Sequence, residues 1–272
     1  MLNIREVRRI VVKVGTSTLT YENGKLNIGR IEQLVRCICD LQNRGYEMVL
    51  VSSGAVTVGA AKLGLAARPH KLSMKQAAAA VGQCELMHIY DKMFLEYGIN
   101  VAQILLTREN ITNDGQRENI HNTFTALLET GVVPIVNEND TVATAELVHI
   151  ENFGDNDTLS AVVARMCGAD LLVIFSDIDG LFDSDPRKNP QAKLIPLVPK
   201  IDAKVRRMAG GAGSSHGTGG MATKLTAAEL CMDAGIPMLV ANGEHVNVLY
   251  DVVDGKQVGT LFARGGKLTC GN

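Results

Sequence analysis

Residues 10–17 read Ile-Val-Val-Lys-Val-Gly-Thr-Ser, and residues 48–56 read Met-Val-Leu-Val-Ser-Ser-Gly-Ala-Val. Each stretch starts as a short run of β-branched and aliphatic residues, typical of a buried strand, and ends in a polar turn that contains glycine. From Ile31 to Leu41 apolar residues recur at helical spacing, and Gly45 ends that pattern. The two stretches therefore predict a βαβ unit with parallel strands.

Further apolar runs recur along the chain, with helical patterns between them. This alternation is typical of a mostly parallel sheet covered by helices on both faces. We therefore predict an α/β fold: a three-layer αβα sandwich with a mostly parallel central sheet, in which residues 1–272 form a single domain. The length of the chain alone would also allow two domains. The predicted strands are residues 10–14, 48–51, 101–106, 132–136, 171–175, 237–240 and 258–262.

Two other segments have distinctive patterns. Residues 74–97 form an alanine-rich helical pattern that stops at Gly98, and this helix packs either within one subunit or at a subunit interface. We expect a homo-oligomer, because symmetric homodimers are the commonest oligomers. After Phe175, turn pairs such as Asp179-Gly180 predict a hairpin excursion.

Composition excludes several classes of protein. The formal net charge is −2 and lysine and arginine are spread along the chain, so no basic face for nucleic acid is predicted. No signal-peptide core is present, and no run approaches the roughly 20 apolar residues of a membrane span. The six cysteines form no CxxC pair or zinc-type spacing, which indicates reduced thiols. We expect a cytoplasmic protein with small-molecule partners, without nucleic acid or membrane.

Polar residues follow the first two predicted strands. Lys13 lies at a strand end beside a glycine turn, where open α/β sheets bind ligands; the alternative is a solvated edge lysine. Ser53 and Gly54 open the next helix, where free backbone N–H groups favour an anion. A serine N-cap is the alternative there, and both can hold at once.

Two more polar stretches come later in the chain. Asn137-Glu138-Asn139-Asp140 follows an expected buried strand, and these side chains either build a turn or line a site. Residues 154–158, Gly-Asp-Asn-Asp-Thr, precede an apolar helix predicted over residues 159–167. One of these residues would serve as an N-cap, whereas three polar residues in succession indicate a binding site.

Residues 210–224 contain six glycines and lead into a helix. Glycine lets the backbone approach phosphates, and a helix N-terminus adds favourable partial charge. The stretch follows neither the Walker A nor the GxGxxG spacing. A generic flexible loop is the alternative, but it gives no reason for Thr223-Lys224 on the first helical turn, so we favour a phosphate site.

Six motifs together resemble the glutamate 5-kinases, a branch of the amino acid kinase family, over essentially the whole chain. NENDTVAT and GTGGMATK are the more specific ones, whereas the strand-end lysine and the SGA turn are shared with aspartokinases, acetylglutamate kinases and uridylate kinases. The motifs are VVKVGTS (11–17), VSSGAV (51–56), PIVNENDTVAT (134–144), GDNDTLSA (154–161), SDIDGLF (176–182) and GTGGMATK (217–224).

The resemblance implies an enzyme that uses ATP and Mg²⁺ to phosphorylate the side-chain carboxylate of glutamate, the first step of proline biosynthesis. It implies that Lys13 contacts the ATP phosphates and that Asp157 orients Lys13 and Lys224 for catalysis. It assigns no metal ligand to the protein. The residues implied to hold glutamate are Ser53, Asp140 and Asn156; those implied to bind the nucleotide are Ser176, Asp177, Thr218, Gly219, Gly220, Met221, Ala222, Thr223 and Lys224.

Several expectations rest on the resemblance alone. Bacterial glutamate 5-kinases often continue into a PUA domain, but this chain ends at Asn272, so we expect the kinase domain by itself. Free proline is an expected inhibitor. Two rival functions stay open: a sibling kinase that uses aspartate, acetylglutamate or a nucleotide monophosphate, and a catalytically silent amino-acid sensor. Lys13, Lys224 and Asp157 argue against the sensor, which needs no phosphoryl-transfer lysines.

Overall fold

The computed structural model describes residues 2–3, 6–142, 155–209, 220–264 and 268–269. Within them the main sheet has eight strands in the order β4-β5-β3-β2-β6-β8-β9-β7. All neighbouring strands are parallel except β8 and β9. The strands are β2 (Arg9–Lys13), β3 (Glu47–Val51), β4 (Val101–Leu106), β5 (Val133–Glu138), β6 (Leu171–Ser176), β7 (Leu197–Val198), β8 (Met238–Asn242) and β9 (Thr260–Phe262).

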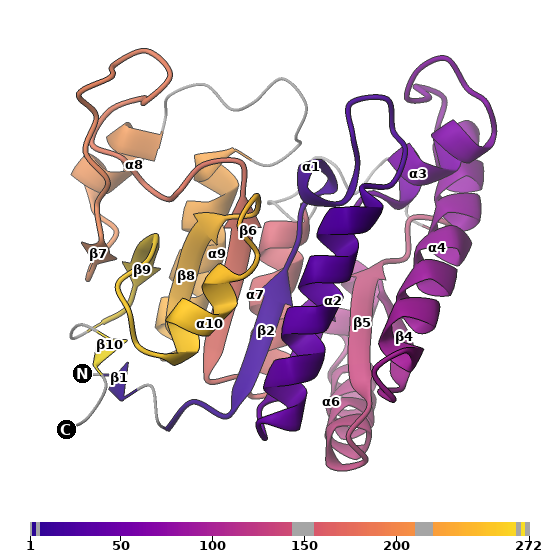
Figure 1. Cartoon of the computed structure of the whole chain (residues 1–272), viewed down its shortest axis with the longest axis horizontal. Coiled ribbons are helices and arrows are strands. Elements are labelled where there is room, and N and C mark those ends of the chain that lie inside the picture. The colour runs from indigo at the N-terminus through magenta and orange to yellow at the C-terminus, as the bar shows by residue number, and fades with distance from the viewer. Residues whose placement is uncertain (1, 4–5, 143–154, 210–219, 265–267, 270–272) are drawn as a thin grey trace.

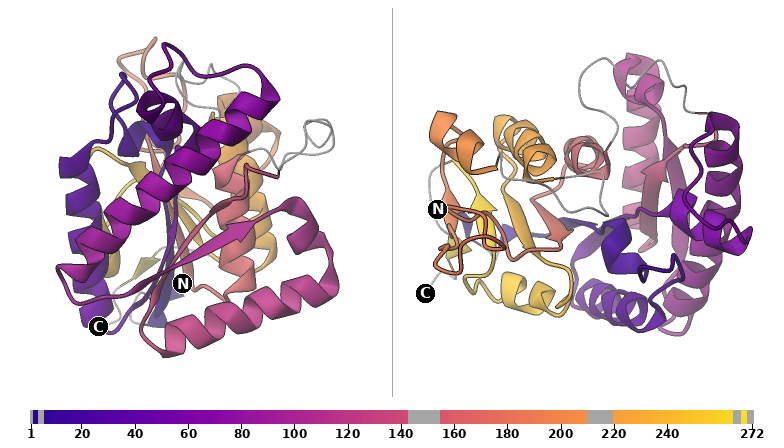
Figure 2. Two further views of the ribbon diagram at one scale, coloured as in Figure 1. Left: turned by 90° about the vertical axis from the view of Figure 1, so that its right-hand side faces the viewer. Right: turned by 90° about the horizontal axis from the view of Figure 1, so that it is seen from above.

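Helices cover both faces of this sheet, as the view from above shows (Figure 2). One layer contains α2 (Ile28–Asn43), α3 (Ala55–Lys62), α4 (Leu72–Leu95) and α10 (Val248–Val253). The other contains α6 (Asp114–Glu129), α7 (Asn156–Met166), α8 (Ala203–Ala209) and α9 (Met221–Asp233). The short helices α1 (Thr16–Leu19) and α5 (Arg108–Thr112) follow β2 and β4. The predicted three-layer αβα sandwich is confirmed.

The central strands are buried on both faces because successive side chains point to opposite sides of the sheet. In β2, Ile10 and Val12 pack into the layer of α2 and α4, whereas Val11 packs into the layer of α7 and α9. Lys13 follows the same alternation, so it lies on the α7 side of the sheet. A continuous apolar run that ends in lysine therefore delivers one charge to the carboxyl edge.

Most element boundaries differ by one to three residues from those predicted, and two of these differences concern pocket residues. Strand β5 was expected to end at residue 136, but it continues through Asn137 and Glu138, which pair with Leu105 and Leu106 of β4. The alternative of a turn built by residues 137–140 therefore does not hold at Asn137 and Glu138, because the parallel ladder extends past the last apolar residue. Helix α7 begins at Asn156 rather than at residue 159. Capping by Asp155 draws three further polar residues, Asn156, Asp157 and Thr158, into its first turn.

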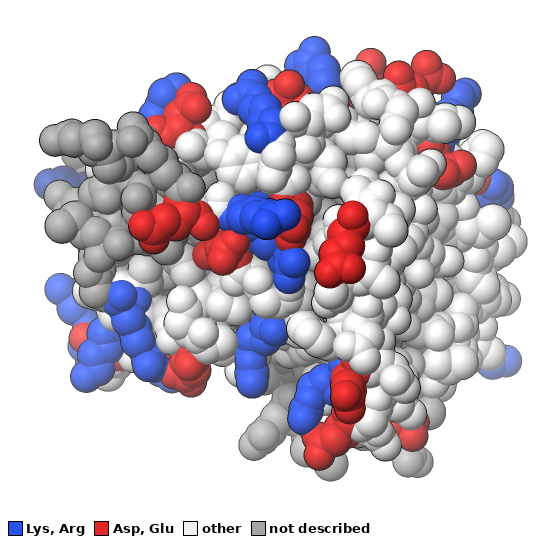
Figure 3. All heavy atoms as spheres, turned by 90° about the horizontal axis from the view of Figure 1, so that it is seen from below, with Lys and Arg blue, Asp and Glu red and all other residues white. Residues whose placement is uncertain are grey.

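The expected hairpin after β6 is present as an antiparallel bridge between Phe182 and Leu194. The two ends of the chain lie close together (Figure 1), where β1 (Leu2–Asn3) pairs with β10 (Leu268–Thr269) in a separate parallel sheet. In the described part of the chain, no helix has the length and apolar character needed to cross a membrane. Seen from below, acidic and basic side chains intermingle on the face opposite α1 and α3 (Figure 3).

Candidate active site

A polar pocket of about 140 Å³ lies at the carboxyl edge of the sheet, on the upper side in Figure 1. The ends of β2, β3, β5 and β6 and the N-terminal turns of α3 and α7 surround it. This edge is where open parallel sheets bind ligands. Of the predicted site residues, the pocket brings together Lys13, Ser53, Asp140, Asn156, Asp157, Ser176, Asp177 and Lys224.

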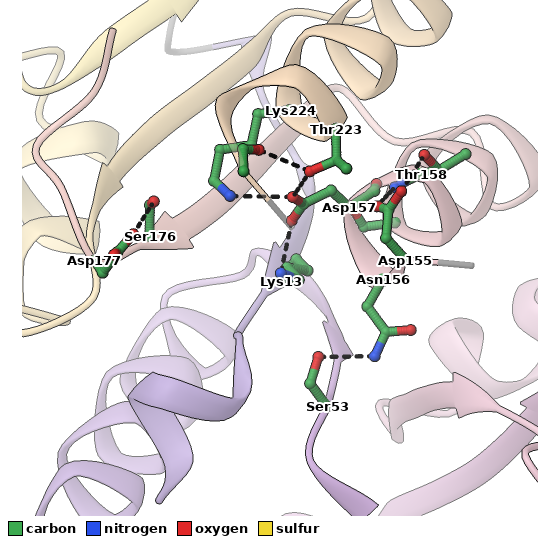
Figure 4. A network of polar contacts seen from close by, with 12 residues as sticks. Lys13, Ser53, Asp155, Asn156, Asp157, Thr158, Ser176, Asp177, Thr223 and Lys224 are labelled. Atoms are coloured by element: carbon green, nitrogen blue, oxygen red, sulfur yellow. Dashed lines mark hydrogen bonds and ion pairs between the residues drawn. The ribbon is translucent and has the colours of Figure 1, made fainter. Parts of the chain in front are cut away.

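Asp157 forms the centre of a charged network in this pocket (Figure 4). Its Oδ1 lies 2.6 Å from Nζ of Lys13, and its Oδ2 lies 3.1 Å from Nζ of Lys224. Oγ1 of Thr223 lies 2.8 Å from the same Oδ2. The side chain of Asp157 is only 1% exposed, and those of Lys13 and Lys224 are 9% and 6% exposed, so three charges share a nearly dry space.

The environment of Asp157 keeps its carboxylate ionised. Burial by itself raises the pKa of Asp157, but the ammonium groups of Lys13 and Lys224 and the hydrogen bond from Thr223 outweigh it, so the pKa is held below its ordinary value. Taken by itself, the network of Lys13, Lys224 and Asp157 has two cations and one anion, and so carries one formal positive charge. That surplus charge is suited to a polyanion such as a phosphate chain.

Local structure explains how three distant residues meet. Asp155 caps α7, its carboxylate accepting from the N–H of Thr158 at 2.8 Å, which places Asp157 in the first turn of the helix. Helix α9 begins after Gly220, and Lys224 lies one turn into it. Because α7 and α9 share one side of the sheet, Lys224 reaches Asp157 from above while Lys13 reaches it from β2.

A second group of side chains surrounds Ser53. Its hydroxyl accepts a hydrogen bond from Nδ2 of Asn156 at 2.8 Å, and the same nitrogen donates to Oδ1 of Asn137 at 3.2 Å. Nδ2 of Asn137 donates to Oε1 of Gln83 at 2.9 Å. Ser53 does not cap α3, whose N-cap residue is Gly54 with φ +90° and no side-chain cap. The alternative of a serine N-cap therefore does not hold for Ser53, since its hydroxyl binds Asn156 instead.

Three carboxyl groups line the remaining wall of the pocket. Burial, with Asp140 and Asp155 nearby, raises the pKa of Glu138 to about 7. Burial also raises the pKa of Asp140, partly offset by Arg68, and the pKa of Asp155, partly offset by hydrogen bonds from Thr158. A buried acidic wall favours a cationic group on a ligand, because a cation restores the stability of the charged carboxylates.

The predicted nucleotide residues are only partly within the described chain. Oγ of Ser176 donates to Asp177, whose other carboxylate oxygen lies 2.8 Å from Nη2 of Arg187. Thr218 and Gly219 lie outside the described residues. Gly220 is the N-cap residue of α9, and the first turn of this helix contains Met221, Ala222 and Thr223. Thr223 joins the charged network through its hydrogen bond to Asp157.

Several pocket residues were not among the predicted site residues. Glu138 and Asp155 stood in motifs already noted, and only their roles were missed. Arg68, which lines the pocket, carried no signal because it stands in a segment without a recognisable motif, and the same holds for Gln83, which contacts the pocket residue Asn137. Among the described residues, no group of three or more His, Cys, Asp or Glu side chains is arranged to hold a metal ion.

The fold is shared with solved structures of low sequence identity. UMP kinase from Bacillus anthracis superposes with a TM-score of 0.64 at 19% identity, covering 96% of this chain and 98% of that one. Isopentenyl phosphate kinase from T. acidophilum gives a TM-score of 0.62 at 16% identity, covering 93% and 99%. At such identity the likeness concerns the fold alone.

Sequence comparison is more specific. The profile of the amino acid kinase family matches residues 8–242. Glutamate 5-kinase of Clostridium perfringens (strain 13 / Type A) is 54% identical over 259 residues, which cover 95% of this chain and 96% of the relative. Glutamate 5-kinase of Listeria innocua is 51% identical over 261 residues, covering 96% and 95%. The chain therefore belongs to the amino acid kinase family and, within it, to the glutamate 5-kinases.

Proposed function

We propose that this protein transfers the γ-phosphoryl group of ATP to the side-chain carboxylate of L-glutamate, forming L-glutamyl 5-phosphate in the first step of proline biosynthesis. The observation that carries the proposal is the buried Lys13–Asp157–Lys224 network at the mouth of a parallel sheet. The identity of 54% to a glutamate 5-kinase over nearly the whole chain supports the choice of substrate.

The chemistry demands charge neutralisation rather than a base. A glutamate side chain has a pKa near 4.3 in water, so it is already a nucleophilic anion at neutral pH. One carboxylate oxygen forms a bond to the γ-phosphorus while the bond to the bridging oxygen of ADP breaks. Positioning and fixed cations supply nearly all of the catalysis in such transfers. Mg²⁺, when bound with ATP, neutralises charge on the phosphate oxygens.

The two lysines are suited to that task. Lys13 and Lys224 hold their ammonium groups on opposite oxygens of Asp157, so each cation has a fixed position before substrates arrive. Preorganised charge of this kind acts on the transition state without further rearrangement. We assign Asp157 to orienting the lysines, and Ser176, Asp177 and residues 218–224 to the nucleotide.

The other half of the pocket suits an amino acid. Ser53, Asp140 and Asn156 line it together with Glu138. Free glutamate carries an α-ammonium group that acetylglutamate lacks, and a buried acidic wall discriminates between the two. We assign Asp140 as the charged partner of this ammonium group.

A substrate panel tests the proposal. ADP release is measured with glutamate, aspartate, acetylglutamate and UMP as acceptors, each with and without Mg²⁺. We expect turnover with glutamate at a kcat/KM far above that of the other acceptors. Preference for another acceptor identifies a sibling kinase, whereas binding of glutamate without ADP release identifies a sensor; either result refutes the proposal.

Further proposals concern inhibition, domain organisation, assembly and location. Free proline, which derives from glutamate, inhibits the enzyme by competing with glutamate. Proline is titrated at two glutamate concentrations, and inhibition that does not depend on the glutamate concentration contradicts this proposal. Residues 1–272 act as one kinase domain, and the protein forms a homo-oligomer and works in the cytoplasm with Mg²⁺-bound ATP. Light scattering of the purified protein measures the assembly directly.

A further inference from the structure

Helix α4 places one buried polar side chain beneath the acceptor pocket. Gln83 is 8% exposed, and a buried amide is costly unless its hydrogen-bonding groups are satisfied. Its Oε1 accepts from Nδ2 of Asn137, which lies 54 positions further along the chain. Gln83 therefore belongs to the hydrogen-bond network of the pocket even though it does not line the pocket.

The amide of Asn137 has one defined orientation. Its Oδ1 accepts from the backbone N–H of Glu138 at 2.9 Å, and a backbone N–H can only donate. Its Nδ2 consequently faces Gln83, whose Oε1 is the acceptor for it. Gln83 and Glu138 thus hold the two ends of this amide.

The amide of Asn156 is oriented in turn. Its Nδ2 donates to the backbone oxygen of Ser52 at 2.9 Å and to Oδ1 of Asn137 at 3.2 Å. Both partners can only accept, so the nitrogen must face them, and Oδ1 is the polar atom that Asn156 retains for a ligand. Figure 4 shows this nitrogen pointing toward Ser53.

Backbone packing brings Gln83 within reach. A Cβ on Gly59 of α3 would lie 1.7 Å from the carbonyl oxygen of Ala78, and one on Gly82 would lie 1.8 Å from that of Ala55. The two helices therefore cross backbone against backbone, which only glycine permits. Gly82 directly precedes Gln83, so this crossing sets the position from which Gln83 contacts the end of β5.

We propose that Gln83 is a positioning residue for substrate specificity: through Asn137 it fixes the amide of Asn156 so that Oδ1 accepts a hydrogen bond from the α-ammonium group of the amino acid. An ammonium group only donates hydrogen bonds, so it is recognised by acceptors. Without the Gln83 acceptor, Nδ2 of Asn137 loses its partner, so this amide is held at one end only and its Oδ1 is less firmly placed against Nδ2 of Asn156. This inference rests on the proposed function and adds the means of its selectivity.

Paired substitutions at position 83 test the proposal. Gln83→Met keeps the length of the side chain and removes the acceptor, whereas Gln83→Glu keeps an acceptor oxygen. Cys84→Ala, at the exposed neighbouring position, is the control. The KM for glutamate and for ATP is measured, together with the inhibition constant of glutarate, which has the same carbon chain and no amino group.

Gln83→Met should raise the KM for glutamate on the order of tenfold, the usual effect of one lost hydrogen bond to a bound ligand. The KM for ATP and the inhibition constant of glutarate should stay within about twofold of the wild-type values. The preference for glutamate over glutarate, which lacks the amino group, therefore falls on the order of tenfold. Gln83→Glu should restore most of this preference, and Cys84→Ala should match wild type.

A parallel loss of glutamate and glutarate binding in Gln83→Met overturns the proposal, because a merely structural role moves both ligands together. Should Gln83→Met not fold by circular dichroism, Gln83→Asn, which withdraws the amide by one methylene, carries the same comparison. A wild-type protein that does not phosphorylate glutamate refutes the proposed function as well. Wild-type activity with an unchanged preference in the variants refutes only the role of Gln83.

Discussion

Replacing Asp157 with asparagine keeps the shape of the side chain and removes the anion between two buried cations. The ammonium nitrogens of Lys13 and Lys224 lie 2.6 and 3.1 Å from its oxygens. At an effective dielectric constant of about 20, each attraction amounts to about 5 to 6 kcal/mol before desolvation is subtracted. Removing one partner of a buried pair costs about 3–5 kcal/mol net, because an uncompensated charge stays behind. We therefore expect Asp157→Asn to lower the free energy of unfolding by about 3–5 kcal/mol.

Thermal unfolding measures the loss directly. At roughly 2 °C per kcal/mol for a chain of this size, Asp157→Asn should melt roughly 6–10 °C below wild type. The kcat with glutamate should fall on the order of 10²-fold, since both lysines lose their fixed positions. The matched control is Asp233→Asn, which makes the same change in an exposed ion pair with Arg264 and should leave both values nearly unchanged.

A double variant separates the electrostatic explanation from lost packing. Lys224→Met combined with Asp157→Asn leaves one buried cation rather than two, so the double variant should lose less stability than the two single losses added together. An Asp157→Asn protein that melts within about 2 °C of wild type and keeps kcat within a few-fold would falsify the role assigned to this carboxylate.

Three further predictions follow from the same pocket. Lys224→Ala should lower kcat on the order of 10²-fold or more while hardly changing the KM for glutamate, with an unchanged circular dichroism spectrum; a kcat within a few-fold of wild type contradicts the assignment. Asp140→Asn should lower kcat/KM for glutamate on the order of 10- to 150-fold with the KM for ATP unchanged, and a selective loss of ATP binding instead moves Asp140 to the nucleotide site. Burial and neighbouring carboxylates raise the pKa of Glu138 to about 7, so its neutral form adds stability that is fully present below pH ~4.5 and is lost as pH rises through about 7. As the Glu138 carboxylate ionises near pH 7, the KM for glutamate should fall. If Glu138→Gln shows the same fall in KM, the fall does not arise from Glu138.

The sequence by itself determined the architecture and the charged network. Apolar runs of four to six residues that alternate with helical patterns allow little except a parallel sheet between two helical layers, and side-chain alternation places Lys13 at its carboxyl edge. Asp157 and Lys224 each stand in a short continuous motif, residues 154–161 and 217–224, so local pattern and family resemblance were enough to single them out. Boundaries at residues 137 and 156 were missed because ladder pairing and capping extend elements beyond their apolar residues.

Only the tertiary structure decided which atoms face the pocket. Gln83 meets Asn137 across 54 positions, and Asn156 meets Ser53 across 103, through a helix crossing that no local pattern encodes. The direction in which the amide of Asn156 points depends on the backbone oxygen of Ser52, just after β3, and on the amide of Asn137 in β5. Amino-acid type fixes which groups can donate or accept a hydrogen bond, whereas the partner that each group finds depends on long-range packing.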